Sequence, residues 1–306
     1  MNDLIIVGGG PAGVAGGVYA ARKKIKTVLI ADNFFGQSVT SGDIQNWIGT
    51  KSISGMELAQ NMEEHLRAYP EIEIVEGEVA ERAEKISEGF RITTNKGKTF
   101  EAKTILVCSG SRRRKIGVPG EDKLNGKGVA YCSICDAPMF KDKVVVVIGG
   151  GNAGLESARD LLQYASKVYL LEFLDVIKGD AVTFEKLKND PKVEVIMPAA
   201  VQEILGSEFV SGLKYLDRKT NESKELALEG VFVEIGAVPN SEFLGDLVNK
   251  NKFNEIETDC LTQRSSLEGI WAAGDVTSAL YKQNNIAAGD ACKAALNIYD
   301  YLNNIK

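Results

Sequence analysis

The stretch from Asp3 to Asp32, DLIIVGGGPAGVAGGVYAARKKIKTVLIAD, reads as strand, glycine turn, helix and strand. Its glycines Gly8, Gly10 and Gly13 follow the spacing G-x-G-x-x-G. The first glycine of such a turn makes the bend, the second lets a pyrophosphate approach the backbone, and the third allows close packing of helix on strand. Because the turn stands between a β-branched run and an amphipathic segment, the stretch predicts a dinucleotide-binding Rossmann unit.

The same pattern returns from Lys143 to Glu172, KVVVVIGGGNAGLESARDLLQYASKVYLLE. Here the turn residues are Gly149, Gly151, Asn152 and Gly154. The two copies are separated in sequence by about the length of one domain, which indicates one copy in each of two domains. The expected fold class is therefore α/β, with two Rossmann-like dinucleotide-binding domains, one for FAD and one for NAD(P)H.

The rest of the chain predicts how the two domains are interleaved. A helix is expected over 55–69 and a closing helix over 286–302, after the strand and Gly-Asp turn of GIWAAGDVT. The closing portion is too short to stand alone, so it is expected to complete the first domain. The predicted FAD-binding domain comprises residues 1–113 and 241–306, and the NAD(P)H-binding domain residues 114–240.

Composition excludes several classes of function. A net charge of −6 and a pI near 5.2 argue against a nucleic-acid partner, which demands a basic face. No apolar run is long enough to cross a bilayer. The first strand begins at Leu4, which leaves no room for a secretory signal. We therefore expect a cytoplasmic protein without a membrane partner.

The stretch YCSICDAP, from Tyr131 to Pro138, contains the pair Cys132 and Cys135. Such a pair can be half a zinc site, a static disulfide or a redox couple. Zinc needs four ligands, but the other cysteines are scattered and the chain has one histidine, His65, so no metal is expected. A static disulfide is unfavourable in the cytosol. A redox couple fits best, with electrons passing from hydride to flavin to disulfide.

In their order, the motifs GGGPAG, FGQ, NWIG, VPGED, YCSICDAP, GGGNAG and AAGD resemble the low-molecular-weight thioredoxin reductases from end to end. They are especially similar to the reductase portion of the flavoprotein component of alkyl hydroperoxide reductase. The resemblance implies the class II type of pyridine nucleotide-disulfide oxidoreductase. It also implies a homodimer, with FAD in the first domain and the nicotinamide cofactor and cysteine pair in the second.

The resemblance also implies which residues meet the flavin. It places Gln37, Asn46, Asp275 and Gln283 near the flavin or its ribityl chain, with Gly36 and Lys282 as further cofactor-binding residues. Asp32 ends the second strand, where an acid can hold the adenosine ribose. The peroxide-reductase flavoproteins carry a thioredoxin-like domain ahead of the first strand. None is expected here, which predicts a separate dithiol partner.

By resemblance, Cys135 receives electrons from the flavin and Cys132 attacks the disulfide of the partner through a mixed disulfide. Exchange needs a proton donor and acceptor, and the chain lacks the C-terminal histidine of glutathione-reductase-like enzymes. Asp136 is the neighbouring side chain suited to that work. Its alternative role is that of an ordinary helix cap.

The segment LLEFLDVIK decides between the two nicotinamide cofactors. Thioredoxin reductases that use NADPH carry arginines after this strand to hold the 2′-phosphate. Here Glu172 ends the strand, with Phe173 and Leu174 after it. An acid can bind both hydroxyls of an unphosphorylated ribose and would repel a 2′-phosphate. NADH is therefore expected in preference to NADPH.

Several alternatives stay open at this point. The partner is expected to be a thioredoxin-like protein, but a glutaredoxin-like protein or a module that feeds a peroxiredoxin fits the sequence as well. Ferredoxin replaces the nicotinamide in some reductases of this shape, although the intact second glycine turn disfavours it. A flavin-binding scaffold without turnover is the alternative from another class. The basic run from Arg112 to Lys115 is interpreted as a polar hinge between the domains rather than a partner site.

Overall fold

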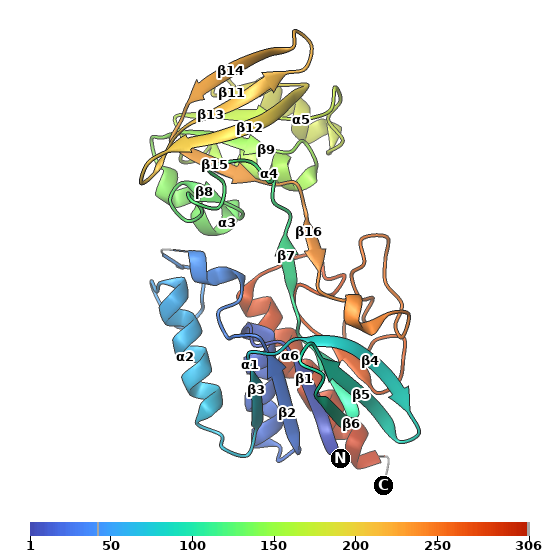
Figure 1. Cartoon of the computed structure of the whole chain (residues 1–306). Helices are drawn as coiled ribbons and strands as arrows, with labels where there is room; N and C mark the ends of the chain where they lie inside the picture. Colours follow the sequence, from blue (N-terminus) through green and yellow to red (C-terminus); the bar gives the residue numbers. More distant parts are fainter. Residues whose placement is uncertain (42, 305–306) are drawn as a thin grey trace. The chain divides into compact units, whose positions relative to one another are not determined.

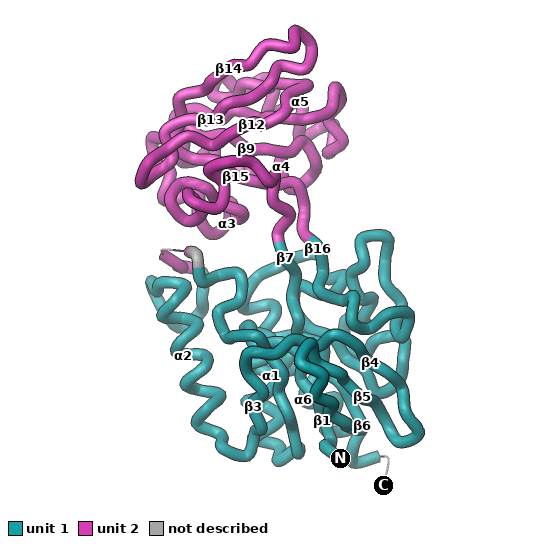
Figure 2. The backbone as a smooth tube through the Cα atoms, viewed as in Figure 1, with its two compact units in different colours: residues 1–39, 46–112, 238–306 teal, residues 40–45, 113–237 magenta. Residues whose placement is uncertain are grey.

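The computed structural model describes residues 1–41 and 43–304. The chain divides into two compact units, coloured separately in Figure 2. The first unit comprises residues 1–39, 46–112 and 238–306, and the second comprises residues 40–45 and 113–237. The sequence-based limits place residues 40–45 in the first domain, whereas this division groups them with the second unit. The functional domain limits themselves stay a prediction.

The first unit is built on a sheet with the order β3-β2-β1-β6-β5-β4, in which β17 also pairs with β6. Strands β3, β2, β1, β6 and β17 run parallel, and β4 and β5 extend the sheet in antiparallel fashion. The strands span β1 Asn2–Val7, β2 Thr27–Ala31, β3 Glu73–Glu76, β4 Ala80–Ile86, β5 Gly89–Thr94, β6 Thr99–Val107 and β17 Ile270–Ala272.

Helices α1 (Pro11–Arg22), α2 (Gly55–Arg67) and α6 (Asn284–Asn304) cover this sheet, as Figure 1 shows. Small residues let α1 pack closely, since a Cβ on Gly16 would lie 2.7 Å from Leu106 Cδ2. Helix α2 ends at Arg67 rather than at Tyr69 because Pro70 disfavours helical backbone in the residue before it. Short 3₁₀ turns η1 (Gln37–Thr40) and η3 (Glu242–Leu244) lie in the connections.

The second unit contains a parallel sheet with the order β11-β10-β9-β15-β8. Its strands are β8 Val129–Ala130, β9 Val144–Ile148, β10 Lys167–Leu171, β11 Val193–Ile196 and β15 Gly230–Val233. Its helical segments are α3 Ser133–Asp136, η2 Ala137–Phe140, α4 Asn152–Leu161 and α5 Ala181–Lys188. An antiparallel sheet adjoins it, made of β12 Ala199–Gly206, β13 Val210–Asp217 and β14 Glu222–Ala227.

The chain passes between the units along two short strands, β7 (Ser111–Arg113) and β16 (Ala237–Pro239), which pair with each other. The basic run that is expected to act as a hinge begins within β7. In the part of the chain that the structure describes, no helix is both long and apolar enough to span a bilayer.

The topology confirms the predicted fold class of α/β with two Rossmann-like domains. In the first unit the chain runs β1–α1–β2, and β6 lies on the other side of β1. In the second unit it runs β9–α4–β10, and β15 lies on the other side of β9. Both glycine turns therefore lie where the strand order reverses, which is where open α/β sheets bind their ligands.

Candidate active site

The glycine turn of the first unit has the geometry that a pyrophosphate requires. Gly8 has a φ of +116°, and a Cβ there would lie 2.2 Å from the carbonyl oxygen of Cys108. A Cβ on Gly13 would lie 1.8 Å from Gly8 O. A Cβ on Gly10 would meet nothing within 4 Å, so this residue presents open backbone directly before α1. The pyrophosphate of FAD fits such a turn, at the positive end of a helix.

The turn of the second unit repeats this geometry. Gly149 has a φ of +118°, and a Cβ on Gly154 would lie 1.8 Å from Gly149 O. Gly151 again faces open space before α4. Asn152 Oδ1 accepts a hydrogen bond of 2.8 Å from Asp180 N, which ties the start of α4 to the following loop. The residues present therefore fit a second dinucleotide.

The acids after the second strands of the two units differ in their surroundings. Glu172 follows β10 and is half-buried, and its carboxylate accepts hydrogen bonds from Gly150 N and Leu174 N. Glu172, the residue that is expected from the sequence to distinguish NADH from NADPH, is thus held against the glycine turn. Asp32 follows β2, is exposed, and accepts a hydrogen bond of 2.9 Å from the side chain of its neighbour Asn33.

Arg218, a residue that the sequence did not point to, contacts Phe173, the neighbour of Glu172. Its guanidinium carbon lies 4.0 Å from the centre of the Phe173 ring, and Nη1 donates a hydrogen bond of 2.5 Å to Phe173 O. Arg218 directly follows β13, so the antiparallel sheet brings it to the loop after β10. No local motif marks it, because its role depends on where that sheet packs.

The residues expected near the flavin come together within the first unit. Gln37 Nε2 donates to Asp275 Oδ2 over 3.1 Å, and Asn46 Nδ2 donates to Gln283 Oε1 over 3.1 Å. Lys282 Nζ donates to Asp275 O over 3.4 Å. The segment before α6 thus meets the loop after β2, although they are far apart in sequence.

This cluster also adjoins the first glycine turn. A Cβ on Gly36, which has a φ of +58°, would lie 3.8 Å from the Cα of Gly10. A Cβ on Gly274 would lie 3.3 Å from that of Ala12 in the first turn of α1. The fold therefore places the predicted flavin residues around one end of the β1–α1 unit. Their contact with the cofactor stays a prediction.

Cys132 and Cys135 form a disulfide with their Cα atoms 5.4 Å apart. Cys132 directly precedes α3, and both cysteines are half-buried. Apolar side chains flank the pair, since Ile134 is 62% exposed and Met139 is 48% exposed. The pair thus lies near the surface of the second unit, where a partner disulfide can approach.

Asp136 is the last residue of α3, and its N–H donates to Cys132 O over 3.1 Å. Burial raises the pKa of its carboxyl to about 6. A carboxyl with a pKa this close to neutrality can both accept and return a proton at working pH. Within the described residues its side chain makes no capping hydrogen bond to η2, so the alternative role as a helix cap is not what the structure supports.

The remaining cysteines have ordinary surroundings. Cys108 is buried, which raises the pKa of its thiol strongly, and burial also raises the pKa of Cys292. Cys260 is exposed. Among residues 1–41 and 43–304, no group of three or more His, Cys, Asp or Glu side chains could hold a metal ion.

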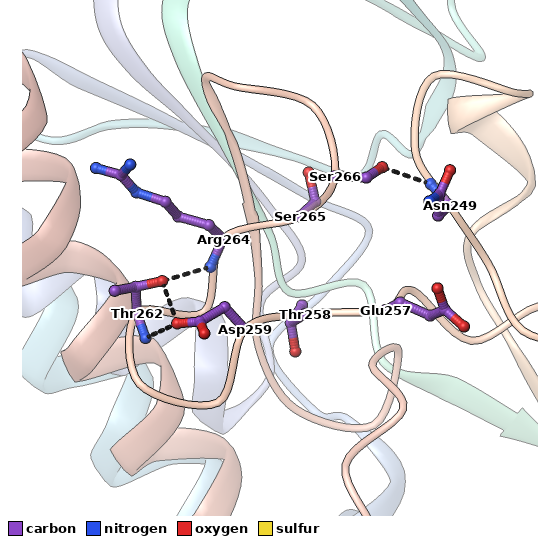
Figure 3. Close-up of a pocket in the computed structure, with 8 residues that line it drawn as sticks. All are labelled: Asn249, Glu257, Thr258, Asp259, Thr262, Arg264, Ser265 and Ser266. Carbon is purple, nitrogen blue, oxygen red and sulfur yellow. Dashed lines mark hydrogen bonds between the residues drawn. The ribbon is translucent and has the colours of Figure 1, made fainter.

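A polar hollow on the first unit, drawn in Figure 3, contains none of the predicted site residues. Its lining is Asn249, Glu257, Thr258, Asp259, Thr262, Arg264, Ser265 and Ser266. Asp259 accepts hydrogen bonds from the backbone and hydroxyl of Thr262, at 2.8 and 2.6 Å. Arg264 Nε donates to Asn297 Oδ1 over 2.8 Å. Because the hollow shares no residue with the predicted site, we assign it no part in the chemistry.

Comparison with known proteins fits this geometry. The model of the family described as pyridine nucleotide-disulphide oxidoreductase matches residues 2–291. The chain belongs to this family. It is 42% identical over 300 residues to an NADH dehydrogenase of Bacillus subtilis, covering 98% of this chain. It is 43% identical over 303 residues to one of the proteins of the alkyl hydroperoxide reductase of Pseudomonas putida, again covering 98% of this chain. The chain spans 58% of the length of each of these two relatives.

Solved structures extend the likeness to the whole fold. The thioredoxin reductase of Streptococcus pyogenes superposes with a TM-score of 0.92 at 33% identity, covering 99% of each chain. That of Giardia duodenalis superposes with a TM-score of 0.91 at 30% identity, again covering 99% of each. The predicted resemblance is confirmed: the chain is a member of the pyridine nucleotide-disulphide oxidoreductase family with a thioredoxin-reductase-like fold.

Proposed function

We propose that the protein moves electrons from NADH through FAD and the Cys132–Cys135 dithiol to a thioredoxin-like protein disulfide. The observation that carries the proposal is the position of the disulfide. It follows β8, in the same parallel sheet whose strand β9 ends in the second glycine turn. The nicotinamide turn and the dithiol therefore belong to one edge of one sheet.

The residues of the first unit would hold the flavin. The open backbone at Gly10 and the start of α1 would receive the pyrophosphate, and Asp32 the adenosine ribose. The cluster around Asp275 would line the flavin ring and ribityl chain. When bound, FAD supplies the chemistry that turns a two-electron hydride donor into a reductant for a disulfide.

Glu172 makes NADH the preferred donor. Its carboxylate is fixed by Gly150 N and Leu174 N, and it retains lone pairs for the two ribose hydroxyls. A 2′-phosphate would have to approach a fixed negative charge, which is unfavourable. The name NADH dehydrogenase, carried by a relative at 42% identity, supports the same preference.

The dithiol would act in two steps on its protein substrate. Cys132 attacks the disulfide of the partner and forms a mixed disulfide, which Cys135 then resolves. Asp136 accepts the thiol proton and returns one to the departing thiolate. The exposed Ile134 and Met139 supply an apolar rim for that encounter.

The partner class has one specific competitor. The similarity to an alkyl hydroperoxide reductase protein favours a thioredoxin-like module that feeds a peroxiredoxin as the substrate. A glutaredoxin-like protein stays a further alternative that no observation favours. The intact second turn and the fixed Glu172 oppose a ferredoxin-dependent enzyme. We further propose a homodimer that works in the cytoplasm.

Turnover with purified partners tests the proposal. The oxidation of NADH is followed with oxidised thioredoxin, oxidised glutaredoxin and a separate thioredoxin-like module as the substrates. A Cys132→Ser/Cys135→Ser variant serves as control, since it should lose partner reduction. The opposite result is that NADH is consumed with oxygen alone, at the same rate in the control variant, and that no partner releases thiols. The protein would then be an NADH oxidase rather than a disulfide reductase.

A further inference from the structure

Arg218 reaches the loop that carries Glu172 from a different sheet. It directly follows β13, and its backbone N–H donates a hydrogen bond of 3.0 Å to Pro198 O. The neighbouring Ala199, the first residue of β12, donates through its N–H to Glu172 O over 2.8 Å. The start of β12 is thus hydrogen-bonded to both segments, which brings the Arg218 side chain to the residues after β10.

The side chain of Arg218 holds one peptide group of that loop. Its guanidinium stacks on the Phe173 ring, and Nη1 donates a hydrogen bond of 2.5 Å to Phe173 O. This carbonyl belongs to the peptide group that joins Phe173 to Leu174. The N–H of the same peptide group, on Leu174, donates to Glu172 Oε1 over 2.8 Å. Arg218 and Glu172 therefore bind opposite sides of one planar peptide group.

The charges on the two sides of this peptide group support each other. A cation at the carbonyl oxygen and an anion at the N–H polarise the group in the same direction, so that each hydrogen bond strengthens the other. If the peptide group turned over, its oxygen would face the Glu172 carboxylate and its N–H would face the Arg218 guanidinium. Both contacts would then be repulsive. Arg218 thus favours the orientation in which Glu172 receives a donor.

The N–H of Leu174 is one of two donors that orient the carboxylate of Glu172. The other is Gly150 N in the glycine turn, which donates to Oε2. Together the two N–H groups hold both carboxylate oxygens and leave the remaining lone pairs for a ligand. A carboxylate that is already held in one orientation loses less conformational freedom when two ribose hydroxyls bind to it.

We propose that Arg218 is a positioning residue for the selection of NADH, and that it acts on Glu172 through the Phe173–Leu174 peptide group. The inference rests on the proposed function, in which Glu172 receives the ribose of NADH. It deepens that function, because it gives the antiparallel sheet of the second unit a part in the choice of cofactor. The proposal requires no contact between Arg218 and the nucleotide.

Equilibrium binding of NAD⁺ and NADP⁺ to the whole protein with bound FAD tests the inference without turnover. Calorimetry gives both Kd values for the wild type and for Arg218→Met, which keeps an unbranched side chain against Phe173 but removes the charge and the donors. We expect the Kd for NAD⁺ to rise about tenfold and the two Kd values to move closer together. Loss of a nearby cation alone would move them apart, because NADP⁺ carries the additional negative charge of the 2′-phosphate.

Matched variants separate this role from a general effect of charge. Lys219 is an exposed cation at the next position, so Lys219→Met should leave both Kd values unchanged. Without any nucleotide, amide hydrogen exchange at Leu174 should be faster in Arg218→Met than in the wild type, and unaltered in Lys219→Met. In a Glu172→Ala background, Arg218→Met should not weaken NAD⁺ binding further, because the residue through which it acts is missing.

Three results would overturn the inference. They are Kd values in Arg218→Met that equal those of the wild type, a greater loss of affinity for NADP⁺ than for NAD⁺, and an undiminished loss of NAD⁺ affinity in the Glu172→Ala background. The second result would make Arg218 a direct ligand of the 2′-phosphate. Wild-type protein that binds neither nucleotide would instead reject the proposed NADH-dependent function, while exchange at Leu174 would still report whether Arg218 holds the peptide group.

Discussion

At the scale of single residues, two opposite charges meet at the loop after β10: Glu172 belongs to this loop, and Arg218, which follows β13, contacts it through Phe173. Glu172 is fixed against the glycine turn, and Arg218 is stacked on Phe173 in the next position. We propose that the carboxylate alone faces the site of the ribose. We therefore expect Glu172, with Arg218 beside it, to bias the choice between NADH and NADPH.

Replacing Glu172 by alanine removes the repulsion toward a 2′-phosphate and leaves the Arg218 cation beside it. We expect the ratio of kcat/KM for NADPH to that for NADH to rise about tenfold, which corresponds to about 1.4 kcal/mol. Asp175→Asn is the matched control, because this exposed carboxylate lies in the same loop. An unchanged ratio in Glu172→Ala would contradict the proposal that Glu172 favours NADH over NADPH.

Replacing Asp136 by asparagine removes the proton carrier but keeps the shape of α3. We expect partner reduction to slow by about a hundredfold, a typical general acid–base contribution. Flavin reduction by NADH should proceed as in the wild type. Stopped-flow absorbance resolves the two steps, and full partner turnover in this variant would contradict the role.

The sequence could predict those site residues whose neighbours along the chain define their chemistry. Cys132, Cys135 and Asp136 lie in one motif, and Glu172 ends a recognisable strand. Arg218 was missed because its place beside Glu172 depends on packing between segments far apart in the sequence. Only the β12–β14 sheet brings an arginine to Phe173.

At the scale of elements, the two strand–turn–helix units were predictable because their glycines are required by the backbone itself. Both first glycines have a positive φ, and both third glycines allow no Cβ. The end of α2 was misjudged by two residues, since the effect of Pro70 on the residue before it was not weighed. The loop from 40 to 45 carries no pattern that predicts the unit to which it belongs.

Alanine substitutions in the first turn should separate folding from binding. Gly10 has extended backbone and open space for a Cβ, so Gly10→Ala should fold normally but bind FAD at least tenfold more weakly. Gly13→Ala would press against Gly8 O and should lower stability by a few kcal/mol. Thermal unfolding of the apoprotein and titration with FAD distinguish these effects. A Gly10→Ala protein with unaltered FAD affinity would contradict the assigned cradle.

At the scale of the whole molecule, two carboxyls of the second unit with raised pKa values, those of Asp136 and Glu234, make the stability of the fold depend on pH. Burial raises the pKa of Asp136 to about 6 and that of Glu234 to about 7, above the values of an unfolded chain. Both groups therefore favour the folded state at low pH, and this contribution is lost as pH rises through about 6 to 7.

We accordingly expect the free energy of unfolding of the second unit to be lower near pH 8 than near pH 5 by an amount on the order of 2 kcal/mol. Its melting temperature should therefore be lower at pH 8, with other conditions equal. Glu234→Gln should reduce this dependence, because the glutamine carries no charge at either pH. Calorimetry at both pH values checks it, and an equally steep dependence in the variant would argue against the buried carboxyl.

In the proposed electron path, electrons enter from NADH and leave through the dithiol. Anaerobic bleaching of the flavin absorbance by NADH and by NADPH, measured side by side, tests this most directly. We predict that NADH bleaches the flavin rapidly and that NADPH bleaches it slowly. In Cys132→Ser/Cys135→Ser the flavin should still bleach, but the protein should take up fewer electrons from NADH in total, because the disulfide that accepts two of them is missing. Bleaching by NADPH alone would overturn the role of Glu172, and bleaching by neither would contradict the proposed electron path.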